Sequence, residues 1–269
     1  IGMGPAGLFA AYLLAQRGYC PHIYERGRAV EERQQDVEDF WNGGALDPES
    51  NVQFGEGGAG TFSDGKLNTL VKDKFGRSRY VLETFVKFGA PEDILYVAKP
   101  HVGTDVLRDV ISRMRQEIIR LGGTFHFSTK VTDLHIEDGR ISKIELNHKE
   151  WKDVSGVILA IGHSARDTFE MLYERKVPMM AKSFAVGMRV EHPQDMINES
   201  QYGRNADMTL LPTAAYKVTH QSSNGRGVYS FCMCPGGYVV NASSEEGRLA
   251  VNGMSYRSRD SKNANSAII

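Results

Sequence analysis

The sequence predicts an α/β layered domain followed by a second, β-rich domain. Over roughly the first 165 of its 269 residues, segments with helical spacing of apolar residues alternate with short, apolar, strand-like segments. This order is typical of helices layered on a sheet. Beyond Ser164, short strand-like pieces predominate. We therefore expect an α/β domain at 1–165, interrupted by a glycine-rich insertion near 40–100, and a β-rich domain at 166–269.

The first elements are predicted from apolar density and a helix terminator. Residues 5–17 are rich in apolar side chains and are followed by Gly18, which indicates a largely buried helix ended by a glycine. A short strand is expected at 20–24, directly before Glu25. The weaker, acidic pattern at 31–41 indicates another helix.

Turn signals and periodicity define the rest of the first domain. Residues 51–65 are almost all turn formers, so a long glycine-rich loop is expected, of the kind that is functional or mobile. Thr104 can cap a helix that extends to about 118, and residues 124–131 alternate like a strand. Asp138-Gly139 between two apolar stretches predicts a hairpin. The apolar run 157–161, closed by Gly162, predicts a strand buried on both faces.

The second half has a different texture. We expect a helix at 165–175, strands at 184–190, 208–211, 214–218 and 228–231, and a polar tail at 255–266.

Composition argues against several classes of protein. Lys and Arg number 32 against 33 Asp and Glu, and no basic run occurs, so a nucleic acid is not an expected partner. No stretch approaches 18 apolar residues, which argues against a membrane span. Three cysteines cannot build a disulfide framework, which favours a cytoplasmic location, and no paired His or Cys residues complete a metal site. The oligomeric state stays open.

The opening residues form a glycine turn suited to a diphosphate. Gly2, Gly4 and Gly7 have the spacing in which the first glycine allows a tight turn, the second close approach to a pyrophosphate, and the third close helix–strand packing. The amides and dipole of the following helix favour negative charge. Glu25, 18 residues after Gly7, can accept hydrogen bonds from the hydroxyls of an adenosine ribose and would repel a 2′-phosphate. The competing interpretation is a helix-opening turn with a solvated glutamate.

A second match to the same spacing occurs at Gly55, Gly57 and Gly60, but no apolar helix follows it. A second dinucleotide fold is therefore not expected there. The amides of this segment could form an anion nest or lie against a flat ring. The alternative is a disordered surface loop.

Several segments resemble the glutathione-reductase-like, two-part FAD flavoproteins: residues 2–7, Tyr24-Glu25-Arg26-Gly27 and residues 157–162. More specifically, the blocks 57–67, 99–105, 231–237 and 263–266 are similar to an uncharacterised family of bacterial FAD-dependent dehydrogenases. The likeness runs over nearly the whole chain. Two features depart from it, because no strand precedes Gly2 and the carboxy-terminal glycine motif that usually closes over the flavin is absent. The chain also stops within an apolar run, so we expect an internal piece of a longer protein.

The resemblance implies a Rossmann-like FAD-binding domain, with a β-rich domain that covers the flavin ring and binds a small-molecule substrate. It implies that the backbone of Val131 meets the adenine and that Ser63, Lys66 and Leu67 approach the ring. The full set of expected FAD-binding residues is Gly2, Gly4, Pro5, Ala6, Gly7, Glu25, Arg26, Ser63, Lys66, Leu67, Val131, Ala160 and Gly162.

The catalytic residues stay unassigned. Cys232 and Cys234 would share one face of a strand and could exchange electrons with a flavin, although buried cysteines more often pack as small apolar groups. His101 could donate a proton near the ring, and His163 could hydrogen-bond cofactor or substrate. For each histidine a purely local role in its loop is the alternative.

These observations favour an FAD-dependent oxidoreductase of unknown substrate. One alternative is an NAD-dependent dehydrogenase, in which Glu25 selects NAD over NADP. Another is a flavin-binding sensor or interaction protein without turnover. Only one dinucleotide turn is visible, so a dedicated NAD(P)H domain is not expected, but NAD(P)H could dock transiently as an electron donor.

Overall fold

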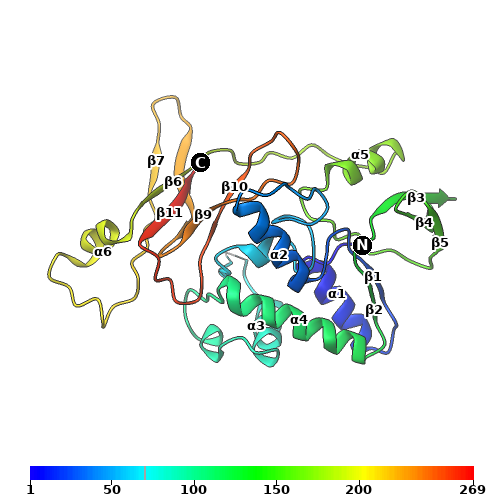
Figure 1. The fold of residues 1–269 in the computed structure, drawn as a ribbon, viewed down its shortest axis with the longest axis horizontal. Helices are drawn as coiled ribbons and strands as arrows, with labels where there is room; N and C mark the ends of the chain where they lie inside the picture. Colours follow the sequence, from blue (N-terminus) through cyan, green and yellow to red (C-terminus); the bar gives the residue numbers. More distant parts are fainter. Residues whose placement is uncertain (70) are drawn as a thin grey trace. The chain divides into compact units, whose positions relative to one another are not determined.

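A computed structural model describes residues 1–69 and 71–269 and combines helices with both parallel and antiparallel strand pairs (Figure 1). The mixture of helix and sheet agrees with the predicted α/β class. The chain divides into two compact units, each assembled from three separate segments. The first unit comprises Ile1–Gly60, Val110–Lys182 and Ala242–Leu249, and the second comprises Thr61–Asp109, Ser183–Asn241 and Ala250–Ile269. The domain boundary near residue 165 stays a prediction.

The four predicted helices are present in the described structure. They are α1 (Pro5–Gln16), α2 (Val30–Trp41), α4 (Thr104–Arg120) and α5 (Arg166–Glu174). In α1 the buried side chains recur at three- and four-residue steps, as expected for a helix that packs one face against the fold. Two further elements of the second unit lacked a clear sequence signal: α3 (Arg77–Lys87) and the 3₁₀ turn η2 (Glu92–Leu95).

The strands of the first unit form two small sheets. In the first, β1 (His22–Tyr24) pairs in parallel with β2 (Thr124–His126). The second is antiparallel and contains β3 (Val131–Glu137), β4 (Arg140–Leu146) and β5 (Glu150–Asp153). The predicted hairpin is confirmed at Asp138 and Gly139, whose φ angles of 49° and 73° are the positive values that a type I′ turn needs. The single strand predicted at 124–131 is wrong, since β2 ends at His126 and β3 begins at Val131.

The apolar run 157–161 does not form the doubly buried strand that was predicted. No strand is assigned there, and Ile158 and Leu159 are 52% and 42% exposed. The run lies beside Ile1, whose amino group donates to the Ile158 carbonyl at 2.8 Å and whose carbonyl accepts from the Ala160 amide at 2.8 Å. One residue supplies these two bonds, which is too little backbone for a ladder.

The second unit contains a four-stranded antiparallel sheet in the order β6–β11–β8–β7. Its strands are β6 (Met188–Pro193), β11 (Asn263–Ile268), β8 (Gly227–Cys234) and β7 (Thr219–Gln221). A separate antiparallel pair joins β9 (Tyr238–Asn241) to β10 (Val251–Met254), and α6 (Gln194–Tyr202) follows β6.

Several sequence expectations for this region need correction. The strand predicted at 184–190 begins only at Met188, and the strands predicted at 208–211 and 214–218 are absent from the described structure. At the first of these two, the Asp207 carboxylate accepts hydrogen bonds from the amide and hydroxyl of Thr209, which stabilises a turn instead. The tail predicted at 255–266 contributes to β11, the inner strand between β6 and β8.

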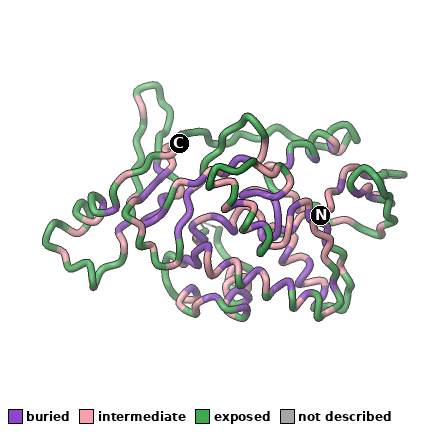
Figure 2. Tube along the Cα trace, in the orientation of Figure 1, coloured by how far each residue is buried: buried purple, intermediate pink, exposed green. Residues whose placement is uncertain are grey.

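The glycine-rich loop after α2 is buried. Every residue from 51 to 62, including the 3₁₀ turn η1 (Ala59–Phe62), is buried or partly buried (Figure 2). The reason is Arg33 of α2, which is fully buried and donates hydrogen bonds to backbone carbonyls along the loop. The accepting carbonyls belong to Asn51, Val52, Glu56 and Gly58, at 2.5–3.0 Å. This burial contradicts the alternative of a disordered surface loop.

A second buried ionisable side chain, Glu56, completes this attachment. One carboxylate oxygen of Glu56 accepts from the Val30 amide at 2.7 Å and pairs with Arg115 at 3.1 Å. Burial raises the pKa of Glu56 to about 7, despite these contacts. Burial also lowers the pKa of Arg33 to about 10, which still leaves the guanidinium protonated at pH 7.

Replacing the buried guanidinium tests this account of the loop. We expect Arg33→Gln to lower the free energy of unfolding by at least about 3 kcal/mol, because buried carbonyls lose a charged donor. The measurement is urea denaturation, with the exposed Arg17→Gln as the matched control. Equal stability of the two variants would show that the Arg33 guanidinium does not hold the loop in place.

Glu56 predicts a pH dependence. The folded protein keeps a proton on this carboxyl up to about pH 7, whereas the unfolded chain releases it near the ordinary pKa of 4.5. Rising pH between these values therefore favours unfolding, and this contribution to stability decreases across that window. We expect Glu56→Gln to remove that decrease in denaturation experiments at pH 5 and pH 8. An unchanged pH dependence, equal to that of the exposed variant Glu137→Gln, would show that Glu56 is not the group responsible.

Candidate functional site

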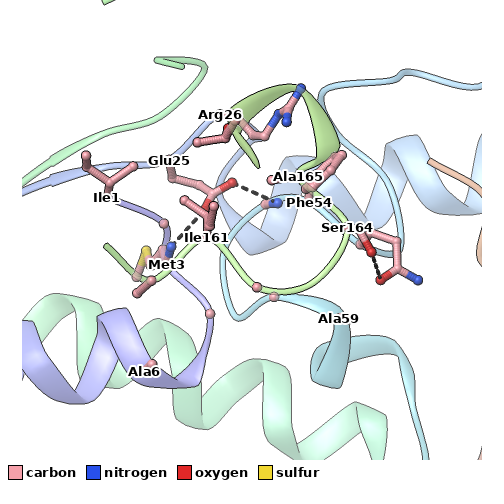
Figure 3. Close-up of a pocket in the computed structure, with 18 of the residues that line it drawn as sticks. Ile1, Met3, Ala6, Glu25, Arg26, Phe54, Ala59, Ile161, Ser164 and Ala165 are labelled. Atoms are coloured by element: carbon pink, nitrogen blue, oxygen red, sulfur yellow. Dashed lines mark hydrogen bonds between the residues drawn. The ribbon is translucent and has the colours of Figure 1, made fainter. Parts of the chain in front are cut away.

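The first unit contains a cavity of about 490 Å³ around the amino-terminal glycine turn (Figure 3). A cavity of this size is within the usual range for cofactor sites. Its lining comes from five stretches of the chain, within 1–6, 24–26, 53–60, 129–131 and 159–169.

Most of the sequence-predicted cofactor residues meet at this cavity. Those that line it are Gly2, Gly4, Pro5, Ala6, Glu25, Arg26, Val131, Ala160 and Gly162. Gly7 is not part of the lining but packs behind it, since a side chain there would overlap the Gly2 carbonyl oxygen. Ser63, Lys66 and Leu67 belong to the second unit, so their approach to a flavin stays a prediction.

The glycine turn has the geometry that its spacing predicts. Gly2 has φ of +89°, and a Cβ there would lie 2.5 Å from the Ala160 carbonyl oxygen. At Gly4, in contrast, the atom nearest to the position that a Cβ would take is the Gly58 Cα, at 3.8 Å. The backbone at Gly4 is therefore uncovered by any side chain at the cavity, and the surrounding atoms would leave room for a Cβ there.

Helix α1 begins at this bare backbone. Its first turn carries no acidic residue, and no side chain caps its amino end. The amides and dipole at this end give the cavity a positive partial charge.

The Glu25 carboxylate ties the cavity walls together. It is 5% exposed, and its Oε2 accepts from the Met3 amide at 2.7 Å (Figure 3). Its Oε1 accepts from the Gly27 and Gly55 amides, both at 2.9 Å. A carboxylate has about four acceptor positions, so roughly one stays available to a ligand.

Arg26 and Lys130 bring positive charge to the cavity wall, but carboxylates neutralise both of them. Arg26 makes a bidentate pair with Asp167 at 2.9 Å and a further pair with Glu49 at 2.5 Å. Lys130 pairs with the same two acids. Burial opposes the charge on Arg26, but its carboxylate partners raise its pKa, and the same contacts hold the pKa of Asp167 well below its usual range. The Arg26 guanidinium also lies 4.1 Å over the Phe54 ring.

A polar group lies at the far rim. The Ser164 hydroxyl is 3.1 Å from the Gln53 side-chain oxygen and 2.7 Å from Nδ1 of His163, and all three residues line the cavity. The sequence argument named His163 but not Gln53 or Ser164.

Sequence reasoning also missed the part that residues 53–60 play in the lining. Their signal was the second glycine motif, whose amides were considered as a nest for an anion or ring. In the structure Gly57 donates to the Met3 carbonyl at 2.8 Å, which attaches this loop directly to the first glycine turn.

His101 lies in the second unit and is 7% exposed. Burial, reinforced by nearby arginines, lowers its pKa to about 4. Its imidazole is therefore neutral at pH 7 and is not an imidazolium proton donor at that pH. Among the residues that the structure describes, no helix is long and apolar enough to cross a membrane.

The role of Glu25 as a structural tie is testable without any ligand. We expect Glu25→Ala to lower the free energy of unfolding by at least about 3 kcal/mol, because three buried amides lose a charged acceptor. Urea denaturation measures this, with the exposed Glu137→Ala as control. Comparable stability of the two variants would show that the amides find other acceptors.

Comparisons with known proteins bear on the same question. Residues 183–269 match the family model described as "FAD-dependent protein, C-terminal domain-like". Over its whole length the chain is 54% identical to an uncharacterised protein of Clostridium beijerinckii (strain ATCC 51743 / NCIMB 8052), and it spans about 50% of that relative. The family match concerns residues 183–269 of the chain.

Proposed function

We propose that the first unit binds the adenosine diphosphate half of FAD and that the protein is an FAD-dependent oxidoreductase. The observation that carries this proposal is the cavity in which the bare turn at Gly4, the amino end of α1 and the Glu25 carboxylate meet. The family match over residues 183–269 supports FAD as the nucleotide.

Backbone groups hold the pyrophosphate in this proposal. The cations of the lining, Arg26 and Lys130, are already matched by Glu49 and Asp167. The positive partial charge that faces a diphosphate therefore comes from the uncapped amides of α1. Gly4 lets the phosphate oxygens approach those amides, since no side chain intervenes.

The ribose lies on Glu25. Because three amides occupy most of its acceptor positions, Glu25 accepts one ribose hydroxyl through Oε2 rather than gripping both hydroxyls symmetrically. A 2′-phosphate would place negative charge against the carboxylate, which disfavours NADP as the resident nucleotide. Val131, at the start of β3, supplies backbone beside the adenine.

FAD, when bound, supplies hydride or electron transfer. The chain's own residues bind and orient it. Ser63, Lys66 and Leu67 are proposed to approach the flavin ring, and a small-molecule substrate and a transient NAD(P)H donor complete the proposed reaction.

The test separates ligand binding from folding by a substitution that the fold tolerates. Gly4 has ordinary φ of −69°, and a Cβ there meets nothing closer than 3.8 Å. We expect Gly4→Ala to keep the stability of the nucleotide-free protein while weakening FAD binding at least about tenfold, or about 1.4 kcal/mol. Flavin fluorescence quenching gives the dissociation constant.

Gly156→Ala is the matched control, because a Cβ at Gly156 meets no atom within 4 Å and Gly156 is not part of the cavity lining. It should bind FAD like the unaltered protein. Competition by ADP should displace FAD, whereas adenosine 2′,5′-bisphosphate should compete poorly. Purified protein that takes up no FAD, or equal FAD affinity for Gly4→Ala and Gly156→Ala, would overturn the proposed site.

A further inference from the structure

In the second unit, strand β8 ends in a strained backbone that carries two cysteines. The pairing of β8 with β11 shifts register between Asn265 and Ala267, opposite this end of β8. Within the shift, Cys232 has φ of 48°, a left-handed value that non-glycine residues rarely adopt. Such strain persists only where surrounding contacts enforce it, and it is concentrated at functional sites.

Arg189 of β6 contacts the strained residue directly. Both terminal nitrogens of its guanidinium donate to the Cys232 carbonyl at 3.2 Å, and one also donates to the Asn265 side chain at 2.6 Å. Gly253 of β10 leaves the necessary room, since a Cβ there would lie 2.3 Å from Arg189 and 2.7 Å from the Cys234 sulfur.

The bend turns the second cysteine back toward the first. The Cys234 thiol donates to the Cys232 carbonyl at 3.4 Å, so its sulfur lies against the backbone of the residue two positions before it. Lys66 lies 3.8 Å from the same sulfur and 3.1 Å from the buried carboxylate of Asp64, and it donates to the Met233 carbonyl.

The two thiols differ in charge and access. When Cys232 is ionised, the Cys234 thiol donates its hydrogen bond to the Cys232 sulfur instead of the carbonyl, and this bond, with the charges of Lys66 and Arg189, lowers the pKa of Cys232 against the effects of burial and Asp64. Donating that hydrogen bond, and burial, raise the pKa of Cys234. Cys232 is half-buried, whereas Cys234 is fully buried.

We propose that Cys232 and Cys234 form a thiol–disulfide exchange site that reduces small disulfide molecules, with Cys232 as the attacking sulfur and Cys234 as the resolving one. The proposal does not depend on FAD.

Two exchange steps balance the reaction. The Cys232 thiolate attacks one sulfur of the small disulfide, forms a mixed disulfide and releases one thiolate. Cys234 then loses its proton and attacks the Cys232 sulfur, which forms the Cys232–Cys234 disulfide and releases the second thiolate. The small disulfide gains two electrons, the cysteine pair loses two, and the released thiolates take up the protons.

The test follows release of the coloured thiolate from 5,5′-dithiobis(2-nitrobenzoate) in a Cys20→Ser background, because Cys20 is an exposed cysteine outside this cluster. In protein that keeps both Cys232 and Cys234, we expect release of two equivalents of thiolate per protein. Intact mass spectrometry should show a product about 2 Da lighter than the reduced protein. With Cys234→Ser we expect one equivalent and a stable adduct that peptide mapping places on Cys232.

A second measurement does not rely on any cysteine variant. In the unaltered protein, iodoacetamide should label Cys232 at pH 7 at least about tenfold faster than Cys20, since the thiolate is the reactive form. Lys66→Gln should move the pH midpoint of Cys232 labelling upward, whereas the exposed Lys262→Gln should leave it unchanged. Circular dichroism checks that each variant is folded.

Three results would each overturn the proposal. They are labelling of Cys232 no faster than that of Cys20, faster labelling of Cys234 than of Cys232, and a persistent mixed disulfide in protein that retains both cysteines.

Discussion

The carboxylate of Glu25 is the constraint on which the first unit depends. Three amides from separate parts of the chain, at Met3, Gly27 and Gly55, converge on its two oxygens. The glycine turn, the segment after β1 and the buried loop therefore share a single acceptor. Arg33 supports the arrangement from behind, since it fixes the loop that delivers the Gly55 amide. The walls of the cavity are therefore joined through one buried carboxylate.

The pairing of charges in the cavity wall also affects which ligands the cavity could accept. Cations and anions in its wall pair with each other, so the proposed binding of a diphosphate would depend on the orientation of peptide groups at the start of α1 rather than on a basic patch. Composition alone would not reveal such a site, because the net charge of the chain is −1.

Local signals predicted the parts of the fold that local interactions decide. Apolar density located α1, apolar spacing located α4, and Asp138-Gly139 located its hairpin, because helix formation and turn conformation depend mainly on residues that are close in sequence. The glycine turn and Glu25 were predictable together from their spacing. Arg33 was not, since an arginine in an acidic helix usually faces water, and only the carbonyls of a distant loop explain its burial. The prediction of a strand at 157–161 was wrong for a similar reason. A strand needs a pairing segment of matching length, and the run itself carries no information about that segment.

The sheet of the second unit has its final strand on the inside. Asn263–Ile268 lies between β6 and β8, which precede it by many residues in the chain. During synthesis on the ribosome, β6 and β8 therefore emerge with their facing edges unpaired and wait for the last strand to arrive. Until then, those edges are open to pairing with other nascent chains, which gives the unfinished sheet a route to aggregation.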